Sequence, residues 1–276
     1  MTDGTDINGS VNTGDTRILI RPDLAMDYVR EIAERWTDPG VLFIDPAAGM
    51  GAFAAPLATE FRRRVRAIDT DPRGGRIKAL DFLRVPAIFG GDHSATAVVG
   101  SPPFGRNAGA IVRYFNHAAE HGADGIAFIV PQSFRKTSVR KRLHAMFHRQ
   151  VDRNVPRRAF LRDGRPHDVD CAWQVWTRGD TERVTEEPPN VDHLLEYTTP
   201  DRAEFAIRRA GYNAGQVLTG DMSKLSRGTT HFVREVRPGV REALENADWS
   251  DVVGRTSSVR SLSKGEIAFR LDGIFG

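Results

Sequence analysis

The sequence contains one cysteine in 276 residues, Cys171. A single cysteine excludes a disulfide within this chain and any zinc site built from several cysteines. No set of histidine, cysteine and carboxylate residues has metal-ligand spacing either, so we expect no bound metal. Cys171 lies outside every motif described below and is expected to be a core residue. A chain without a disulfide framework suits a reducing compartment, and we expect a cytoplasmic protein.

Long hydrophobic runs are also missing from the sequence. Apolar runs such as Val41–Ile44 and Gly125–Val130 are far shorter than the roughly 20 residues that a membrane-spanning helix needs. The N-terminal stretch is polar and acidic, the opposite of a signal peptide. We therefore expect no membrane association, and a disordered segment over residues 1–16.

Lysine is scarce, because only five of the 39 basic residues are lysines, and the net charge is only +3. The basic residues nevertheless concentrate between Arg135 and Arg165, where 11 of them face only two acids, Asp152 and Asp163. Such a run is often a solvated face, and the alternative is a track for the phosphates of a nucleic acid. The candidate nucleic-acid contacts are Arg135, Lys136, Arg140, Lys141 and Arg142.

Hydrophobic periodicity indicates short strands alternating with helices over the first two thirds of the chain. This alternation predicts an α/β fold with a doubly wound, mostly parallel sheet. Residues 168–178 read as a late strand that lies antiparallel at the edge of the sheet. The pattern predicts strands at 41–45, 65–69 and 125–131, strand-and-loop units at 87–92 and 97–104, and helices at 23–36, 53–61, 73–83, 111–119 and 137–147.

Composition divides the chain into a main domain over residues 17–178, a linker over 179–190 and a small C-terminal region over 191–276. The linker is rich in charged residues, threonine and proline. The C-terminal region has helix-like stretches at 201–210 and near Lys264–Leu271. We expect this region to recognise a target or dock a partner.

Three acidic residues follow predicted strands in a pattern that indicates a nucleoside site. Asp45 precedes the glycine-rich turn Pro-Ala-Ala-Gly49-Met-Gly51, where backbone can approach a ligand closely. Asp69 ends the next strand, where a carboxylate can accept both hydroxyls of a ribose. Asp92 follows the expected third strand and could accept from an adenine amino group. Each acid alone could be a surface or capping residue, so the prediction depends on all three standing at the ends of predicted strands.

The segment Ser101-Pro102-Pro103-Phe104 follows the expected fourth strand. Taken alone, the double proline could be no more than a rigid turn. Proline has a fixed φ and no N–H, so the segment is stiff and presents carbonyl acceptors. A rigid pair of acceptors beside an aromatic face suits a flat ring that carries an amino group. This segment is the candidate catalytic loop.

These motifs, DPAAGMG, AIDTDP, GDH and SPPF, resemble in order and spacing those of the amino-methyltransferases that modify adenine N6 or cytosine N4. FIVPQSF at 128–134 resembles a later motif of that family, and RPDLAMDYV at 21–29 resembles its N-terminal helix. The resemblance covers roughly residues 17–178, with the cofactor motif before the catalytic motif, as is usual among adenine enzymes. FAIRRAGYNAG and SLSKGEI resemble the tails of phage-type methylases.

The resemblance implies a Rossmann-like methyltransferase fold and S-adenosylmethionine as the cofactor. It assigns the cofactor to Arg21, Asp45, Ala47, Gly49 and Gly51, with Asp69 on the ribose and Asp92 on the adenine. Ser101, Pro102, Pro103 and Phe104 would hold the target base. Methyl transfer is then a direct displacement that depends on orientation and electrostatics, and in duplex DNA the base would first leave the stack.

The resemblance predicts a DNA adenine-N6 methyltransferase, with several alternatives. Adenine enzymes generally have Asn or Asp where this chain has Ser101, and serine is commoner in the N4-cytosine group. An RNA methyltransferase acting on adenine N6 or guanine N2 has a similar loop, as has an enzyme that methylates protein glutamine. A methyltransferase-like subunit that binds nucleic acid without catalysis is the alternative from another class.

Overall fold

The computed structural model describes residues 18–105, 108–162, 164–253 and 261–276. The chain forms two compact units, one from residues 1–134 and 138–184 and one from residues 135–137 and 185–276. The division after Val184 falls inside the expected linker, whereas the expected disordered segment 1–16 lies outside the described residues. No helix in the described ranges is long and apolar enough to cross a membrane.

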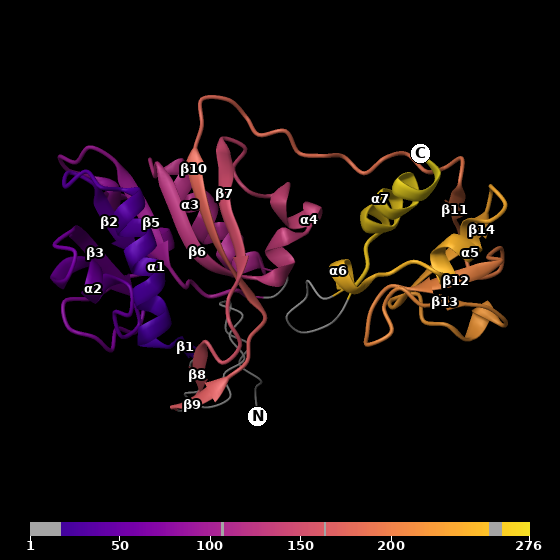
Figure 1. The fold of residues 1–276 in the computed structure, drawn as a ribbon, viewed down its shortest axis with the longest axis horizontal. Coiled ribbons are helices and arrows are strands. Elements are labelled where there is room, and N and C mark those ends of the chain that lie inside the picture. Colours follow the sequence, from indigo (N-terminus) through magenta and orange to yellow (C-terminus); the bar gives the residue numbers. More distant parts are fainter. Residues whose placement is uncertain (1–17, 106–107, 163, 254–260) are drawn as a thin grey trace. The chain divides into compact units, whose positions relative to one another are not determined.

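The first unit is built on a seven-stranded sheet with the order β4-β3-β2-β5-β6-β10-β7 (Figure 1). The strands β4, β3, β2, β5 and β6 run parallel to one another, and β10 is antiparallel to both of its neighbours. The bounds are β2 Leu42–Asp45, β3 Arg64–Asp69, β4 Lys78–Ala79, β5 Thr96–Gly100, β6 Gly125–Pro131, β7 Phe147–Asn154 and β10 Cys171–Arg178.

Helices cover both faces of this sheet. Successive residues of a strand point to opposite faces, so neighbouring residues of β2 pack against different helices. Phe43 packs in one core cluster with Ile32 of α1 (Pro22–Arg35), and the next residue, Ile44, packs in the other with Phe115 of α3 (Gly109–Glu120). A shorter helix, α2 (Ala54–Thr59), follows the glycine-rich turn. The predicted doubly wound α/β fold is therefore confirmed.

A small antiparallel sheet flanks this core in the order β1-β8-β9. Its strands are β1 Ile18–Ile20, β8 Phe160–Arg162 and β9 Arg165–His167. Helix α1 begins directly after β1, with Pro22 in its first turn, where the missing N–H costs nothing.

Four details of the predicted pattern are wrong in this unit. The antiparallel strand β10 lies one place inside the sheet, and β7 takes the edge. Residues 73–83 form the two-residue strand β4 and a 3₁₀ turn at Phe82–Arg84 instead of a helix. Residues 87–92 contain no strand, because Pro86–Phe89 forms another 3₁₀ turn, and the Arg66 guanidinium donates to carbonyls within it and after it.

The fourth detail is the expected basic helix at 137–147, which ends after one turn as α4 (Thr137–Arg140). The Arg183 guanidinium donates to the backbone carbonyls of Arg140, Leu143, His144 and Phe147. Carbonyls that accept from this side chain do not need the backbone amides of a further helical turn as donors. Arg183 lies 36 to 43 residues further along the chain, so no local pattern reveals it.

The C-terminal unit is built on a four-stranded antiparallel sheet with the order β11-β14-β12-β13. Its own core includes Leu195, Phe205, Val233, Leu244 and Ile267. The expected helix at 201–210 is wrong, because this stretch contains β12, whereas the expected helix near Lys264–Leu271 is confirmed as α7. The bounds are β11 Leu195–Tyr197, β12 Phe205–Arg208, β13 Val217–Leu218, β14 Thr230–Glu235, α5 Val240–Glu245, α6 Ser250–Val253 and α7 Lys264–Phe275.

Candidate active site

The connections of the sheet reverse direction between β2 and β5. From β2 the chain proceeds to β3 and β4 on one side, and from β5 it proceeds to β6 on the other. In open α/β sheets the crevice at the carboxyl ends of two such strands is the usual ligand site. The glycine-rich turn follows β2 and the Ser-Pro-Pro-Phe segment follows β5, so the two predicted loops meet at this switch point, which we call the crevice.

The glycine loop is fixed by backbone hydrogen bonds to the neighbouring strand. The Ala48 amide donates to the Ile68 carbonyl at 2.9 Å, and the Gly49 amide donates to an Asp69 carboxylate oxygen at 2.8 Å. Gly49 and Gly51 have φ values of 54° and 87°, a region that favours glycine. The two positions of the loop with positive φ are therefore both occupied by glycine.

The segment after β3 closes over the same loop. The Arg73 amide donates to the Gly49 carbonyl at 3.0 Å, and a Cβ at Gly74 would lie 2.6 Å from the Met50 carbonyl oxygen. Gly74 is thus a position where backbone passes directly over backbone, a role that the sequence pattern did not identify.

Asp69 is buried and holds the glycine loop as well as the end of its own strand. One carboxylate oxygen accepts from Gly49, and the other accepts from the Asp71 amide at 2.8 Å. Each carboxylate oxygen can accept more than one hydrogen bond. The structure brings Asp69 and the glycine turn together, as the strand-end register predicted.

Asp45 is 1% exposed at the end of β2. One of its oxygens accepts from the Ala47 amide at 3.4 Å, while Oδ2 has no hydrogen-bond partner within the described part of the chain. Burial raises the pKa of Asp45 to about 7, and the neighbouring Asp69 adds to the rise. A buried carboxylate oxygen without a hydrogen-bond partner is costly, so a polar ligand group that donates to Oδ2 would relieve this cost.

Gly100 joins the two loops and was missed by the sequence analysis. A Cβ at this position would lie 2.8 Å from Asp45 Oδ1, and its φ is 146°. The register pairs Ile44 with Val98, so Gly100 stands beside the start of the glycine loop. The signal available in the sequence was a glycine directly before Ser-Pro-Pro-Phe.

The residues of the Ser-Pro-Pro-Phe segment differ in their exposure to solvent. Ser101 is half-buried, Pro102 is buried and Pro103 is exposed. Phe104 is partly buried and packs against both core clusters, and its carbonyl accepts from the Ile111 amide at 3.4 Å. The segment is thus anchored at its aromatic end to the start of α3, next to the crevice.

Asp92 lies away from the other predicted cofactor residues. The Ser94 amide donates to the Gly40 carbonyl just before β2, and the Arg64 guanidinium donates to the Asp92 carbonyl at 2.6 Å. These contacts belong to the amino ends of the strands, and Asp92 itself is exposed. The structure therefore does not bring Asp92 to the crevice at the carboxyl edge.

Asp81 occupies the position that the sequence analysis gave to Asp92. It follows the third parallel strand, β4, whose Ala79 pairs with Asp69. Its carboxylate accepts from the Leu83 amide at 3.0 Å and pairs with Arg84 at 3.3 Å, and its side chain is 37% exposed. A strand of only two residues leaves no periodicity to detect, but an Asp directly before an apolar pair was visible as a capping signal.

Arg21 lies between β1 and α1. Its amide donates to the Ala159 carbonyl at 2.8 Å, and its guanidinium pairs with Asp23 at 2.5 Å. The preceding strand approaches the glycine loop, because Leu19 lies 3.8 Å from where a Cβ at Gly49 would be. The segment containing Arg21 is therefore near the predicted cofactor residues, with its side chain engaged by Asp23.

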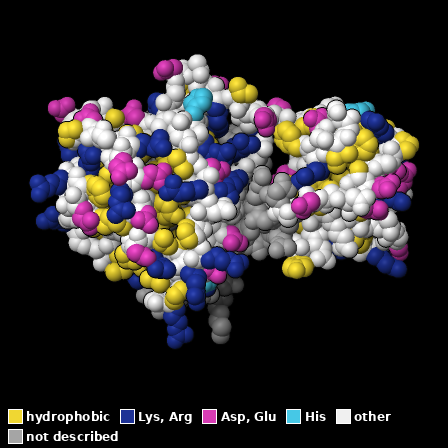
Figure 2. Space-filling view, viewed as in Figure 1, with side chains coloured by type: hydrophobic (Ala, Val, Ile, Leu, Met, Phe, Trp, Pro, Cys, Tyr) yellow, Lys and Arg dark blue, Asp and Glu magenta, His cyan; other side chains and the backbone are white. Residues whose placement is uncertain are grey.

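The five candidate phosphate contacts divide between the two units. Arg135 and Lys136 belong to the C-terminal unit, and Arg140, Lys141 and Arg142 belong to the first. Lys141 and Arg142 are exposed, whereas Arg135 and Arg140 are half-buried. The Lys136 side chain is only 11% exposed. Figure 2 shows many Lys and Arg side chains on the visible face of the molecule, interspersed with acids.

Two further findings concern groups outside this crevice. Among the described residues, no cluster of three or more His, Cys, Asp or Glu residues could hold a metal ion. Cys171 is buried in β10, and burial raises the pKa of its thiol to about 12. A thiol with so high a pKa is a poor nucleophile.

No protein-family model and no curated protein matches this sequence. Several solved structures are similar to it. TrmN from Thermus thermophilus shares 19% identity over 57% of this chain and 48% of its own, with a TM-score of 0.41. A modification subunit described for a type I restriction enzyme of Vibrio vulnificus shares 17% over 61% and 46%, with a TM-score of 0.42.

TYW2 from Pyrococcus horikoshii, solved with MeSAdo, shares 12% identity over 58% of this chain and 65% of its own, with a TM-score of 0.36. This chain spans about half the length of TrmN and of the Vibrio subunit. At these low scores, the fold is established by the strand order of the chain itself.

Proposed function

We propose that this protein is an S-adenosylmethionine-dependent methyltransferase that modifies an exocyclic amino nitrogen of a nucleobase, adenine N6 in DNA. The observation that carries the proposal is the meeting of two loops at one switch point. The glycine loop after β2 and the Ser-Pro-Pro-Phe segment after β5 flank the same crevice, and Gly100 packs directly against Asp45.

The residues at the carboxyl edge fit the proposed cofactor. Asp69 would accept from the ribose hydroxyls and Asp81 from the adenine amino group, while Gly49 and Gly51 let the backbone approach the ligand. The buried Oδ2 of Asp45 supports a polar ligand group in this crevice. When bound, S-adenosylmethionine supplies a methyl group on a sulfonium, which is already strongly electrophilic.

The target loop supplies orientation. The Ser101 hydroxyl and the Pro102 carbonyl would accept the two amine hydrogens, which aims the nitrogen lone pair, and Phe104 would stack on the base. The loop contains no general base, which suits an amine better than a ring carbon. Adenine is favoured by the order of the two motifs along the chain.

A second candidate is methylation of cytosine N4, which Ser101 favours, because serine at this position resembles the cytosine group. For either target base, the Ser101 hydroxyl is a weaker orienting acceptor than a carboxylate would be. An RNA target and an inactive nucleic-acid-binding subunit are further outcomes that one experiment separates. We propose that the C-terminal region, residues 191–276, recognises the target.

The test is incubation with methyl-labelled S-adenosylmethionine and matched DNA and RNA, followed by mass spectrometry of the nucleosides. We expect N6-methyladenine from DNA. N4-methylcytosine would correct the base and keep the reaction, label in RNA alone would correct the substrate, and a C5-methylated base would refute the mechanism. Phe104→Ala should lower turnover because a base stack is worth roughly 1–3 kcal/mol, and Phe104→Tyr, which keeps the ring, is the matched control.

Thermal-shift titration with the cofactor separates an enzyme from an inactive subunit. A protein that binds S-adenosylmethionine is stabilised in proportion to the logarithm of the ligand concentration. Absence of stabilisation, together with unlabelled nucleic acid, would favour the inactive subunit.

A further inference from the structure

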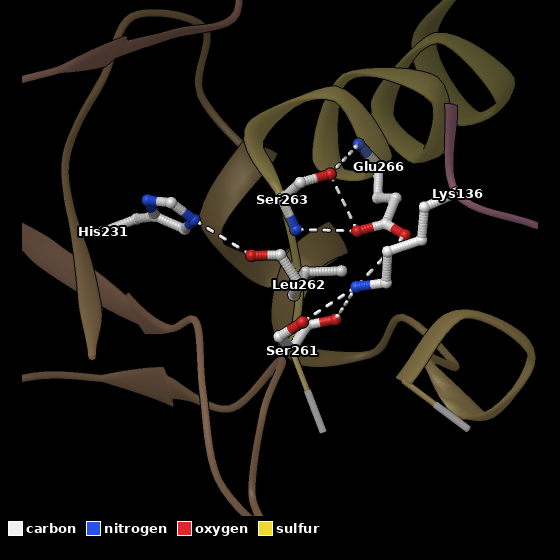
Figure 3. A network of polar contacts seen from close by, with 6 residues as sticks. All are labelled: Lys136, His231, Ser261, Leu262, Ser263 and Glu266. Atoms are coloured by element: carbon white, nitrogen blue, oxygen red, sulfur yellow. Dashed lines mark hydrogen bonds and ion pairs between the residues drawn. The ribbon is translucent and has the colours of Figure 1, made fainter. Parts of the chain in front are cut away.

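Lys136 is the centre of a polar network inside the C-terminal unit (Figure 3). Its ammonium donates to the Ser261 carbonyl at 2.9 Å and to the Ser261 hydroxyl at 2.8 Å, and lies 3.9 Å from Glu266 Oε1. The Lys136 and Glu266 side chains are 11% and 13% exposed. The contact joins residues 125 positions or more apart in the sequence.

Glu266 has a second role in the same network. Its other oxygen, Oε2, accepts from the amide and the hydroxyl of Ser263, each at 2.7 Å, and the Glu266 amide donates back to the Ser263 hydroxyl at 3.2 Å. These contacts are the capping box that begins α7. One carboxylate thus both caps the terminal helix and faces the Lys136 ammonium.

The partner of Lys136 is itself held in place. Ser261 forms an isolated bridge with Ala210 next to β12, and the neighbouring Leu262 amide donates to the Arg209 carbonyl at 2.8 Å. His231 Nε2 lies 3.1 Å from the Leu262 carbonyl. The ammonium is therefore bonded to a segment fixed on two sides to the sheet of this unit.

This environment separates Lys136 from the exposed basic residues around it. A nearly buried ammonium is tolerated only when it is paired and hydrogen-bonded, and Lys136 meets that condition through Ser261 and Glu266. It is therefore unsuited to contact a phosphate on the surface, unlike Lys141.

The position of Lys136 in the chain gives the network its significance. Residues 135–137 follow β6 by way of a short 3₁₀ turn at Gln132–Arg135, in which Gln132 and Phe134 are buried and belong to the first unit. The Gln132 amide group donates to the Cys171 carbonyl at 2.9 Å, so the chain is anchored in the large sheet just before Arg135. Strand β6 neighbours β5, whose carboxyl end carries the target loop.

We propose that Lys136 and Glu266 are positioning residues, through which the C-terminal unit fixes the segment that leaves the carboxyl end of β6. Loss of the pair removes one of the contacts that hold residues 135–137 within the C-terminal unit and loosens the segment that follows the carboxyl end of β6. The kinetic consequence rests on the proposed methyltransferase function, whereas the local loosening does not.

The experiment compares three variants of the full chain. Glu266→Gln removes the charge that faces Lys136, yet glutamine still closes a capping box. Lys136→Met removes the ammonium and keeps the length of the side chain. Lys224→Met is the matched control, because Lys224 forms an exposed pair with Asp221 in the same unit, at 3.2 Å and with the lysine side chain 80% exposed.

Amide hydrogen exchange of peptides covering residues 132–140 is the first readout. We expect both pair variants to exchange at least about tenfold faster there than the wild type, because a broken buried pair permits local opening. Lys224→Met should match the wild type. Equal protection in Glu266→Gln and wild type would overturn the proposal, and this variant decides the matter if Lys136→Met does not fold.

Kinetics provide the second readout. The expected pattern is a raised KM for the nucleic acid with an unchanged Kd for S-adenosylmethionine, which a general loss of stability would not produce. Unchanged KM in both pair variants would refute the positioning role. If the wild type itself methylates nothing, the proposed function is wrong. The hydrogen-exchange data still test whether Lys136 and Glu266 hold residues 135–137.

Discussion

The two loops at the crevice reach rigidity by different means. The glycine loop is held by hydrogen bonds to β3 and to the segment after it, and Gly49 and Gly51 permit its turns. The Ser-Pro-Pro-Phe segment has two consecutive prolines, whose rings restrict the backbone without any hydrogen bond. One loop depends on its neighbours and the other on its own covalent structure, so substitutions should affect them differently.

Gly100→Ala should have the largest effect, because Gly100 lies where the two loops meet. The added Cβ would stand 2.8 Å from Asp45 at a φ of 146°. We expect roughly 1–3 kcal/mol of lost stability from backbone strain and a similar loss from overpacking. Chemical denaturation measures it, and Gly109→Ala, with nothing within 4 Å of its Cβ, is the control. Equal losses in the two variants would contradict the close approach.

Asp45→Asn should change how stability depends on pH. The pKa of Asp45 is raised from 3.8 to about 7, so the folded state binds this proton more tightly than the unfolded chain does. Its stabilising contribution is complete below the unfolded pKa and is lost as pH rises through the folded value. Between the two, it should lower the free energy of unfolding by up to about 1.4 kcal/mol per pH unit.

Denaturation of the wild type and the variant across that interval measures this contribution. The variant cannot ionise, so its free energy of unfolding should fall less steeply with rising pH than that of the wild type. Parallel curves would show that the Asp45 carboxylate is solvated, and the glycine loop would then be less closed than its hydrogen bonds indicate.

Asp69→Ala should weaken binding of S-adenosylmethionine by roughly 1–3 kcal/mol. The variant loses an acceptor for the ligand and also the bond that fixes Gly49. Asp71→Ala is the control, because the Asp71 carboxylate pairs at the surface with Arg73 at 3.6 Å. Calorimetry with equal affinities for the two variants would remove Asp69 from the site.

The smallest effect concerns the exposed basic residues Lys141 and Arg142. Neutralising Lys141 and Arg142 together should weaken nucleic-acid binding about equally across sequences. The slope of log K against log salt should fall by about 0.9 for each lost phosphate contact on duplex DNA. An unaltered slope would restore the interpretation of this segment as a solvated face.

The sequence was most informative where a strand with a clear apolar pattern ended in a distinctive loop. Asp45, Asp69 and Ser101 follow strands with clear apolar patterns, and parallel pairing then brings their ends to one edge. Asp81 was missed because β4 has two residues, and Asp92 was chosen from a segment that a 3₁₀ turn interrupts.

Long-range side-chain contacts explain the other errors. Arg183 ends the expected basic helix from 36 or more residues away, and Lys136 looked like part of a charged surface although Ser261 and Glu266 enclose its ammonium. Hydrophobic periodicity carries no information about such partners, so only the folded structure reveals these roles.

The central claim is that the carboxyl edge of the sheet binds the cofactor, and a pair of aspartates tests it most directly. Asp81→Asn and Asp92→Asn make the same chemical change at opposite edges. Calorimetric titration with S-adenosylmethionine should show weaker binding for Asp81→Asn by roughly 1–3 kcal/mol and wild-type affinity for Asp92→Asn. Weakened binding in Asp92→Asn with wild-type affinity in Asp81→Asn would contradict the account.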